Sequence, residues 1–145
     1  MEIRRVNIDQ INDITNLLVS TFNSEPWNES WTYEMAQERI GGLLSNPMAI
    51  AYAAIQDNEL ISCVIGYITN YMSSKEFFIE EFLVSNAFQN KGYGTKSLVF
   101  IENDLKSEGV TSLTLLTERG FPSEKFYQKN RFIQNKHLVF MKKRL

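Results

Sequence analysis

The sequence predicts one mixed α/β domain, in which a mostly antiparallel sheet is covered by helices on both faces. Two patterns lead to this fold class: candidate strands gather as a hairpin in the middle of the chain, and strands alternate with helices in its second half. The length of 145 residues suits one domain and is too short for two. Hydrophobic residues make up 43% of the chain and charged residues 22%, which is typical of a globular protein rather than a disordered or membrane one.

The N-terminal part begins with a strand and two helices. Residues 2–6 form a short candidate strand, and apolar residues recur at helical spacing over 11–22. The polar stretch 23–31, which contains a proline and two tryptophans, is typical of a connection. Thr32 is a candidate cap for a helix over 33–44, which ends shortly before a proline because proline cannot continue it.

The middle of the chain is rich in candidate strands. Residues 49–56 and 59–67 are separated by Asp57-Asn58, a dipeptide that favours a tight hairpin turn, so we expect an antiparallel pair. A polar turn over 73–75 leads into a third strand over 77–84, which is rich in aromatic and branched residues.

The C-terminal part alternates between helices and strands. Apolar spacing predicts a helix over 98–105 that ends before Gly109. A strand over 111–117 follows, and then a short helix over 122–130 with proline in its first turn. The pattern of 136–142 predicts a closing strand.

Charge and residue usage exclude several classes of protein. The formal net charge is −2 and the basic residues are dispersed apart from 142–144, so we expect no nucleic-acid partner. The N-terminus is polar, and no window approaches the roughly 18 apolar residues of a membrane span, so we expect a cytoplasmic protein without membrane association. Cys63 is the only cysteine and His137 the only histidine, which excludes a disulfide framework and a Cys/His zinc site within one chain. The apolar surroundings of Cys63 favour a buried core thiol.

A glycine-containing turn joins a candidate strand to a candidate helix at 88–95 (Phe-Gln-Asn-Lys-Gly-Tyr-Gly-Thr). Glycine lets the backbone turn sharply and expose consecutive N–H groups, and the helix start adds about half a positive charge. Lys91 can add a full charge, so the turn suits a diphosphate. Taken alone, the pattern is equally compatible with a tight turn that binds nothing.

Two common nucleotide-binding motifs do not fit this turn. A P-loop needs Gly-Lys-Ser/Thr at the helix start, whereas Gly94 is followed by Thr95 and Lys96. A dinucleotide-binding fold needs a third glycine at the position where Ser97 stands. The turn therefore argues against both an NTP and a dinucleotide.

Two segments together resemble a known family. Residues 80–84 (Glu-Glu-Phe-Leu-Val) followed by 89–94 (Gln-Asn-Lys-Gly-Tyr-Gly) are similar to the signature of the GNAT superfamily of N-acetyltransferases, which has Gln/Arg-x-x-Gly-x-Gly/Ala after a buried strand. Residues 125–132 resemble the family's Phe-Tyr-x-Lys-x-Gly-Phe segment. The resemblance implies a GNAT-like sheet with a splayed central strand pair, acetyl-CoA as co-substrate with no metal, and direct acetyl transfer to a primary amine.

The resemblance also implies where acetyl-CoA binds. In the family, its pantetheine arm lies between the splayed strands, which places this role on the backbone of Phe82, Leu83 and Val84. Its pyrophosphate lies on the backbone amides of the glycine turn, and Thr95 is expected to cap the helix start. The implied cofactor-binding residues of the turn are Gln89, Asn90, Lys91, Gly92, Tyr93, Gly94 and Thr95.

Acetyl transfer to an amine needs a neutral amine, donors for the developing oxyanion and a proton for the departing thiolate. The resemblance implies that Tyr127 supplies the proton and that a backbone N–H of Leu83 or Val84 serves the oxyanion. Strand alternation sends Glu80 and Glu81 to opposite faces, so only one is expected to face the cleft.

The family's acceptor-facing positions on this strand fall on Phe78 and Glu80, which makes Glu80 the predicted base. Glu81 is then expected to face the other layer, paired with a basic residue. Two departures affect the resemblance. Many members have a cofactor-contacting Asn where this chain has Gly120, and Arg131 stands at the usual glycine, so that either the turn differs or Asn130 becomes left-handed.

The acceptor site is implied to involve residues 22–39, where Trp27 and Trp31 offer aromatic walls beside carboxylates. Such a lining suits a cationic amine, which can be a polyamine, an aminoglycoside or a peptide terminus. The tryptophans are equally suited to anchoring a loop on the core. Two alternative functions stay open, a catalytically silent acyl-CoA sensor and a protein-interaction module, and the chain is expected to be a monomer or a homodimer.

Overall fold

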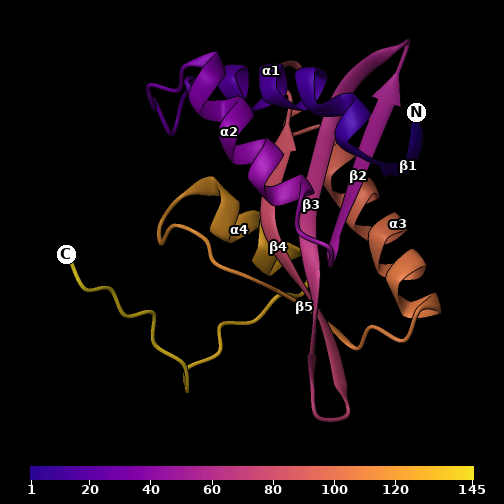
Figure 1. Cartoon of the computed structure of the whole chain (residues 1–145), viewed down its shortest axis with the longest axis vertical. Helices are drawn as coiled ribbons and strands as arrows, with labels where there is room; N and C mark the ends of the chain where they lie inside the picture. Colours follow the sequence, from indigo (N-terminus) through magenta and orange to yellow (C-terminus); the bar gives the residue numbers. More distant parts are fainter.

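A computed structural model describes residues 1–145 as five strands and four α-helices (Figure 1). In chain order these are β1 (Glu2–Val6), α1 (Ile11–Phe22), α2 (Tyr33–Leu44), β2 (Ala49–Gln56), β3 (Glu59–Tyr71), β4 (Ser74–Val84), α3 (Tyr93–Ser107), β5 (Ser112–Leu115) and α4 (Pro122–Lys129). The strands form one sheet in the order β1-β2-β3-β4-β5, in which only β4 and β5 are parallel. The predicted mixed, mostly antiparallel sheet is confirmed.

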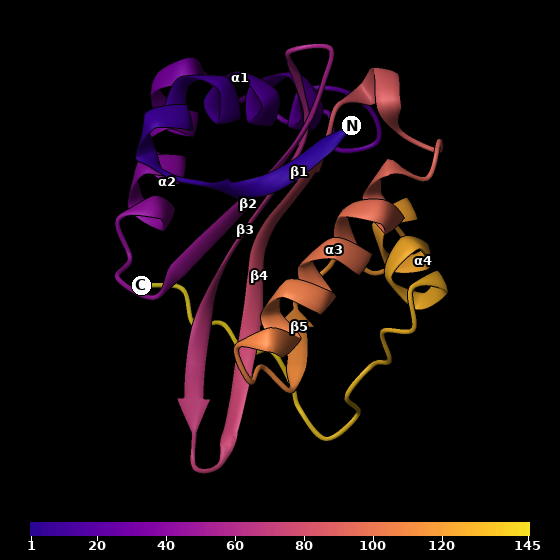
Figure 2. The same ribbon diagram turned by 90° about the vertical axis from the view of Figure 1, so that its right-hand side faces the viewer.

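Different helix pairs cover the two faces of the sheet, as predicted. Figure 2 shows α1 and α2 on one side and α3 and α4 on the other. Neighbouring residues of a strand enter opposite cores because side chains alternate across the sheet. On β2, for example, Ala51 packs in the core beneath α1 and α2, whereas Tyr52 packs in the core beneath α3. None of the helices combines the length and apolar character that a membrane crossing requires.

The β2–β3 hairpin has the predicted two-residue turn. Asp57 and Asn58 both have positive φ values, 51° and 63°, as a tight turn that matches strand twist requires. The β3–β4 hairpin is longer than predicted, because its ladder continues to the pair Tyr71–Ser74. This arm projects beyond the rest of the sheet (Figure 1). Ladder hydrogen bonds rather than burial hold it, so the hydrophobic pattern that marks other strands fades there.

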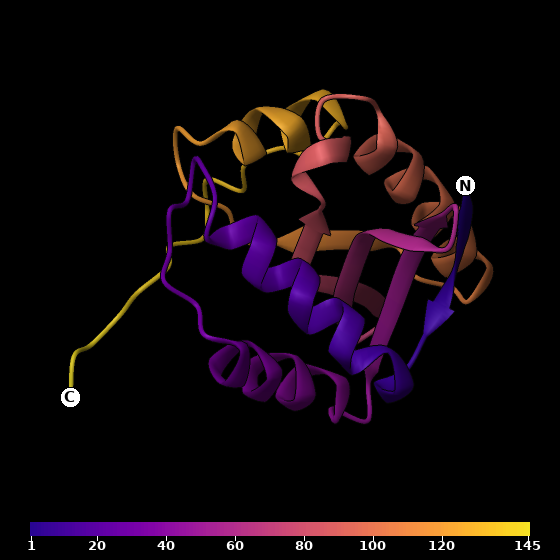
Figure 3. The same cartoon turned by 90° about the horizontal axis from the view of Figure 1, so that it is seen from above.

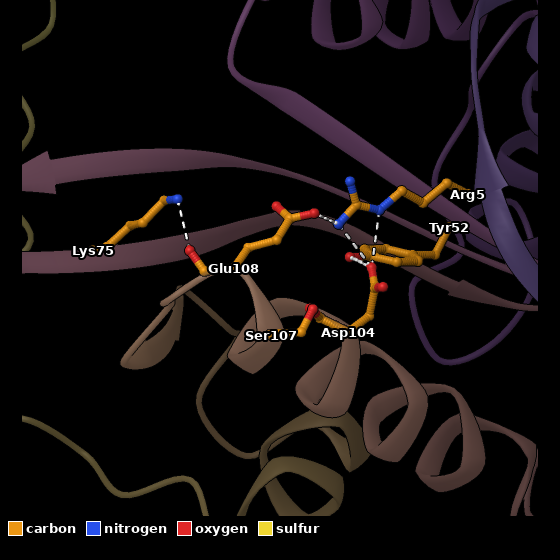
Figure 4. Close-up of polar contacts among 6 residues, drawn as sticks. All are labelled: Arg5, Tyr52, Lys75, Asp104, Ser107 and Glu108. Atoms are coloured by element: carbon orange, nitrogen blue, oxygen red, sulfur yellow. Dashed lines mark hydrogen bonds and ion pairs between the residues drawn. The ribbon is translucent and has the colours of Figure 1, made fainter.

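A polar cluster fastens α3 to the sheet (Figure 4). Arg5 of β1 donates to Asp104 over 2.9 Å and to Glu108, and the Tyr52 hydroxyl donates to Asp104 over 2.8 Å. Lys75 donates to the carbonyl of Glu108 over 2.9 Å. These contacts hold the C-terminal half of α3 against β1, β2 and β4. By fixing the helix, they also help to orient the glycine turn at the N-terminus of α3.

The chain beyond α4 contradicts one prediction. No strand forms over 136–142, and the segment leaves the body of the protein (Figure 3). Its residue pattern is that of a strand, but a strand needs a neighbouring edge, and within one chain this segment lies against none. The strand predicted over 111–117 is also shorter and covers only Ser112–Leu115.

Candidate active site

The central strands β4 and β5 separate at one end of the sheet. They pair only from Glu76–Ser112 to Ile79–Leu115, whereas on its other side β4 stays paired with β3 up to Val84. The last five residues of β4 therefore have a free edge toward β5. This is the splay that the sequence predicted.

The hydrogen-bond alternation of the β3–β4 pair decides which backbone groups face this gap. Ser85 donates its N–H to the Ile61 carbonyl over 2.8 Å, so the alternation directs the backbone groups of Leu83 toward β3 as well. Those of Phe82 and Val84 then point into the gap. Of the three predicted pantetheine contacts, Phe82 and Val84 have this orientation, while Leu83 is a fully buried core residue.

A β-bulge lies at the start of the gap. Ile65 is opposite Glu81 and Gly66 is opposite Ile79, so Glu80 is an extra residue on β4. An extra residue breaks the alternation of side chains. As a result Glu80 and Glu81 line the same cavity, and the prediction that they face opposite layers is wrong.

Arg39 of α2 contacts both of these carboxylates. Its Nε donates to Glu81, and its Nη2 lies 3.8 Å from Glu80 Oε2. The predicted basic partner of Glu81 is thus present. Burial raises the pKa of the Glu81 carboxyl, the charge of Arg39 opposes this shift, and the charges of Glu80 and Glu29 add to it.

The raised pKa of Glu81 predicts a specific dependence of stability on pH. The native protein holds this proton more tightly than the unfolded chain, whose glutamates have a pKa of about 4.3. The stabilisation is fully present below that value and is lost as the pH rises through the native pKa, by up to about 1.4 kcal/mol per pH unit. Urea unfolding of the wild type and of Glu81→Gln between about pH 4 and pH 8 should therefore give curves that diverge, and parallel curves would contradict the assignment.

A cavity of about 380 Å³ occupies the gap. It lies between the free edge of β4 and the chain that follows β5. Its lining is acidic and aromatic, with no lysine or arginine among the thirteen residues that form it. These are Phe22, Trp27, Glu29, Ile79, Glu80, Glu81, Phe82, Leu116, Thr117, Glu118, Phe121, Ser123 and Tyr127.

The cavity brings together only some of the residues predicted to bind the acceptor. Trp27 and the predicted base Glu80 line it. Trp31 lies outside the lining, packs against the core beneath α1 and α2, and donates its Nε1 proton to Glu29 over 3.3 Å. Phe78 also lies outside the lining and packs against Tyr67, with ring centroids 5.5 Å apart.

Sequence reasoning missed two carboxylates of the cavity. Glu81 was assigned to the other face because nothing in the alternation of β4 showed the bulge. Glu118 lies in the irregular loop after β5, where no periodic pattern indicates which way a side chain points. One signal in the sequence could have indicated the orientation of Glu81. Gly66 lies in the middle of a strand pattern, and such a glycine often marks a bulge.

Tyr127 enters the cavity from α4. Its ring packs against Phe82, Phe126 and Phe132, with centroid separations of 6.3, 5.2 and 5.3 Å. Burial raises the pKa of the Tyr127 phenol, and the negative charge of Glu81 raises it further. The hydroxyl therefore stays protonated at neutral pH and is available as a donor.

The glycine turn carries an unusual row of free backbone donors. Helix α3 begins at Tyr93, and Gly92 occupies its cap position with a φ of 82°, while Asn90 is also left-handed at 59°. From Asn90 to Thr95, no backbone N–H donates to another backbone group. Six consecutive donors at the positive end of a fifteen-residue helix form a site that fits an anion.

The side chains of this turn differ in what they do. Gln89 donates to the Val84 carbonyl over 3.0 Å and to Asn86 over 2.9 Å, which fastens the turn to the end of β4. Lys91 donates to the Ala87 carbonyl over 2.7 Å and so folds back along the turn. Thr95 lies in the first turn of α3 and does not cap it, which corrects the sequence prediction because the cap position belongs to Gly92.

The two departures from the family pattern take defined conformations. Gly120 has a φ of 83°, which favours glycine at that position. Arg131 is itself left-handed at 68°, whereas Asn130 has a φ of −93°, so the alternative of a left-handed Asn130 is wrong. The Phe132 N–H donates to the Tyr127 carbonyl over 3.0 Å and closes the end of α4.

Solved structures share this fold over nearly their whole length. A possible acetyltransferase from Clostridium difficile 630 has a TM-score of 0.82 at 12% identity, covering 99% of this chain and 97% of that one. A ribosomal-protein-alanine N-acetyltransferase from Brucella melitensis biovar Abortus 2308 has a TM-score of 0.78 at 14% identity, covering 99% of both chains. An aminoglycoside N-acetyltransferase in complex with CoA has a TM-score of 0.75 at 17% identity, covering 99% and 95%.

These structural likenesses establish the fold, and a sequence comparison establishes the family. No curated protein matches the chain. The sequence model of the acetyltransferase (GNAT) family matches residues 11–132, which is most of the chain and includes both the glycine turn and Tyr127. The protein belongs to the acetyltransferase (GNAT) family.

Proposed function

We propose that the protein is an acetyl-CoA-dependent N-acetyltransferase that moves an acetyl group directly to a primary amine of a small molecule or peptide, without a metal. One observation carries this proposal. Three features meet in the gap between β4 and β5: the acidic cavity, the free edge of β4 and the phenol of Tyr127, whose pKa is raised. A proton acceptor, a proton donor and a backbone binding edge therefore share one site.

The chain offers acetyl-CoA a fitting set of backbone groups. The unpaired amides from Asn90 to Thr95 suit its pyrophosphate, because they add to the positive end of α3. The backbone of Phe82 and Val84, directed into the gap, suits the amide groups of its pantetheine arm. When bound, acetyl-CoA supplies the activated acetyl group.

Three groups of the chain have roles in the transfer. Glu80 takes a proton from the incoming ammonium, directly or through water, so that a neutral amine attacks. The Val84 N–H donates to the oxygen that becomes negative, since the backbone of Leu83 faces β3. Tyr127 gives its proton to the departing thiolate.

The acceptor that fits the cavity is a cationic amine with a second positive charge. Its lining carries Glu29, Glu80, Glu81 and Glu118, and Arg39 balances only part of their charge. Trp27 adds an aromatic surface for an ammonium group. Solved structures of this fold include proteins named for aminoglycosides and for a ribosomal-protein alanine, so both small-molecule and peptide acceptors belong in a test.

The proposal is tested by calorimetry with acetyl-CoA and by an amine panel monitored for free thiol. The panel contains spermidine, an aminoglycoside, a peptide with an N-terminal alanine, and a monoamine of similar size that carries no other charge. We expect saturable acetyl-CoA binding and the highest kcat/KM for an amine with two or more charges. Glu118→Gln should lower kcat/KM for such amines by roughly tenfold, about 1.4 kcal/mol, and leave acetyl-CoA affinity unchanged.

Other outcomes would overturn the proposal in distinguishable ways. Binding of acetyl-CoA with no turnover of any amine would point to a silent acyl-CoA sensor. The absence of binding would point to an interaction module. A preference for the monoamine would leave the acetyltransferase activity in place and contradict only the assigned acceptor.

A further inference from the structure

The loop between α1 and α2, residues 23–32, brings two side chains to the cavity (Figure 1). Trp27 and Glu29 both line it. None of the residues 23–32 is buried, so packing holds this loop only weakly. The placement of Trp27 and Glu29 in the cavity therefore depends on the hydrogen bonds that close the loop.

One side chain makes the main closure. Asn23 follows the last residue of α1 and donates an Nδ2 proton to the Trp31 carbonyl over 2.9 Å. Its Oδ1 accepts the Trp31 N–H over 2.8 Å. An asparagine amide carries a donor and an acceptor side by side, so it satisfies both backbone groups of one residue, as a neighbouring strand would.

The body of the protein fixes both ends of this closure. The backbone N–H of Asn23 donates to the Val19 carbonyl over 3.1 Å, which keeps Asn23 at the end of α1. The Trp31 ring packs against the core beneath α1 and α2. Thr32 then caps α2 by accepting the Met35 N–H over 3.2 Å. The Asn23 amide thus joins two anchored points, and the residues between them form a closed loop.

Contacts inside the loop orient its two cavity residues. Glu29 donates its N–H to the Phe22 carbonyl over 2.9 Å, and its carboxylate accepts the Trp31 Nε1 proton over 3.3 Å. The Trp27 ring meets the Phe22 ring edge to face, with centroids 5.3 Å apart. Asn23 therefore holds Trp31, and Trp31 holds the carboxylate of Glu29.

The carboxylate of Glu29 is oriented but not neutralised. Arg39 pairs with Glu80 and Glu81, whereas no lysine or arginine of the chain forms an ion pair with Glu29. An oriented carboxylate loses little freedom when it binds an ammonium group, so more of the interaction energy appears as affinity.

We propose that Asn23 is a positioning residue for the acceptor, because its amide keeps Trp27 and Glu29 where they contact the amine. Asn23 itself touches neither the amine nor the acetyl group. This role rests on the proposed acetyltransferase function and adds the residue that sets acceptor affinity. Its loss should change KM for the amine and leave the chemical step alone.

Kinetics of Asn23→Ala give the first test. The probe is the multiply charged amine of the panel that has the highest kcat/KM. Its KM should rise roughly tenfold, because two hydrogen bonds are lost together. The kcat and the calorimetric affinity for acetyl-CoA should stay within about twofold of the wild type. Asn16→Ala, an exposed asparagine of the same helix outside the closure, is the matched control and should keep both constants.

Tryptophan fluorescence follows the loop without turnover. Trp27 and Trp31 are the only tryptophans of the chain, so the emission reports on this loop alone. Titration of the same amine in the presence of CoA should change the emission, and Asn23→Ala should move the midpoint to a roughly tenfold higher concentration. The Trp31 amide should also exchange its hydrogen roughly tenfold faster in the variant, because it loses its acceptor.

Glu29→Gln separates positioning from a general loss of structure. It removes the charge that the closure holds in place, so Asn23→Ala should raise KM only about threefold in this background. The same rise in both backgrounds would overturn the role of Asn23, as would a fall in kcat at an unchanged KM. A wild type that turns over no amine would overturn the proposed function and this role together. Wild-type turnover with an unchanged KM in Asn23→Ala would overturn this role alone.

Discussion

Gly66→Ala is expected to lower the free energy of unfolding by about 3 kcal/mol or more, because a methyl group there meets closer neighbours than at any other glycine of the chain. A Cβ at this position would lie 2.3 Å from the Phe78 carbonyl oxygen and 2.5 Å from Phe77 Cζ. The first contact is with backbone, which cannot rotate away. Relief therefore requires moving β3 from β4 at the bulge.

The measurement is urea and thermal unfolding of the two proteins. A loss of about 3 kcal/mol corresponds to roughly 10 °C in Tm for a domain of this size. Gly42→Ala is the matched control, since its Cβ meets nothing within 4 Å and it lies inside α2. Alanine there should stabilise the protein by up to about 1 kcal/mol. A Gly66→Ala protein within about 1 kcal/mol of the wild type would show that the bulge tolerates a side chain.

The same substitution connects stability to the site. The bulge at Gly66 is what brings Glu80 to the side of the sheet that Glu81 occupies. If the bulge is removed, normal alternation returns and the two carboxylates separate. At a low temperature at which the Gly66→Ala protein still folds, its kcat/KM should therefore fall by more than the decrease in the fraction of folded protein explains.

The features that the sequence predicted well depend on local patterns. The order of the elements follows from helical and strand periodicity, and the Asp57-Asn58 turn follows from residues that accept positive φ. The glycine turn belongs to the same group, because Gly92 accepts the left-handed conformation of the cap position of α3. Such features need no knowledge of distant residues.

The features that were missed depend on contacts between distant residues. A basic partner for Glu81 was predicted but not identified, because Arg39 is 42 positions away and only the packing of α2 on the sheet brings the two together. The bulge is a property of the β3–β4 pair and not of either strand alone. The closing strand over 136–142 was predicted from a valid pattern, yet a strand forms only where it lies against a neighbouring edge, and this segment pairs with none of the strands.

Tyr127→Phe is expected to slow acetyl transfer by about 10²-fold to 10⁴-fold, the range that a positioned proton donor contributes. The substitution keeps the ring that packs against Phe82, Phe126 and Phe132 and removes only the hydroxyl. The calorimetric affinity for acetyl-CoA should therefore change little while kcat falls. Tyr71→Phe, on the exposed hairpin arm, is the control and should keep full activity. A variant that loses cofactor affinity with an unchanged kcat would reverse the assigned role.

The pH profile separates a donor role for Tyr127 from a general effect of the substitution. Burial and the charge of Glu81 raise the pKa of this phenol above its ordinary value of about 10. A donor of this kind keeps its proton across the working range, so the wild-type rate should rise as the amine loses its proton and should not fall before about pH 10. Tyr127→Phe should lower the plateau of this profile and keep its rising limb. The assignment is contradicted if the wild-type rate falls near neutral pH and Tyr127→Phe abolishes that fall. The phenol would then ionise in the working range and could not be the donor that its burial indicates.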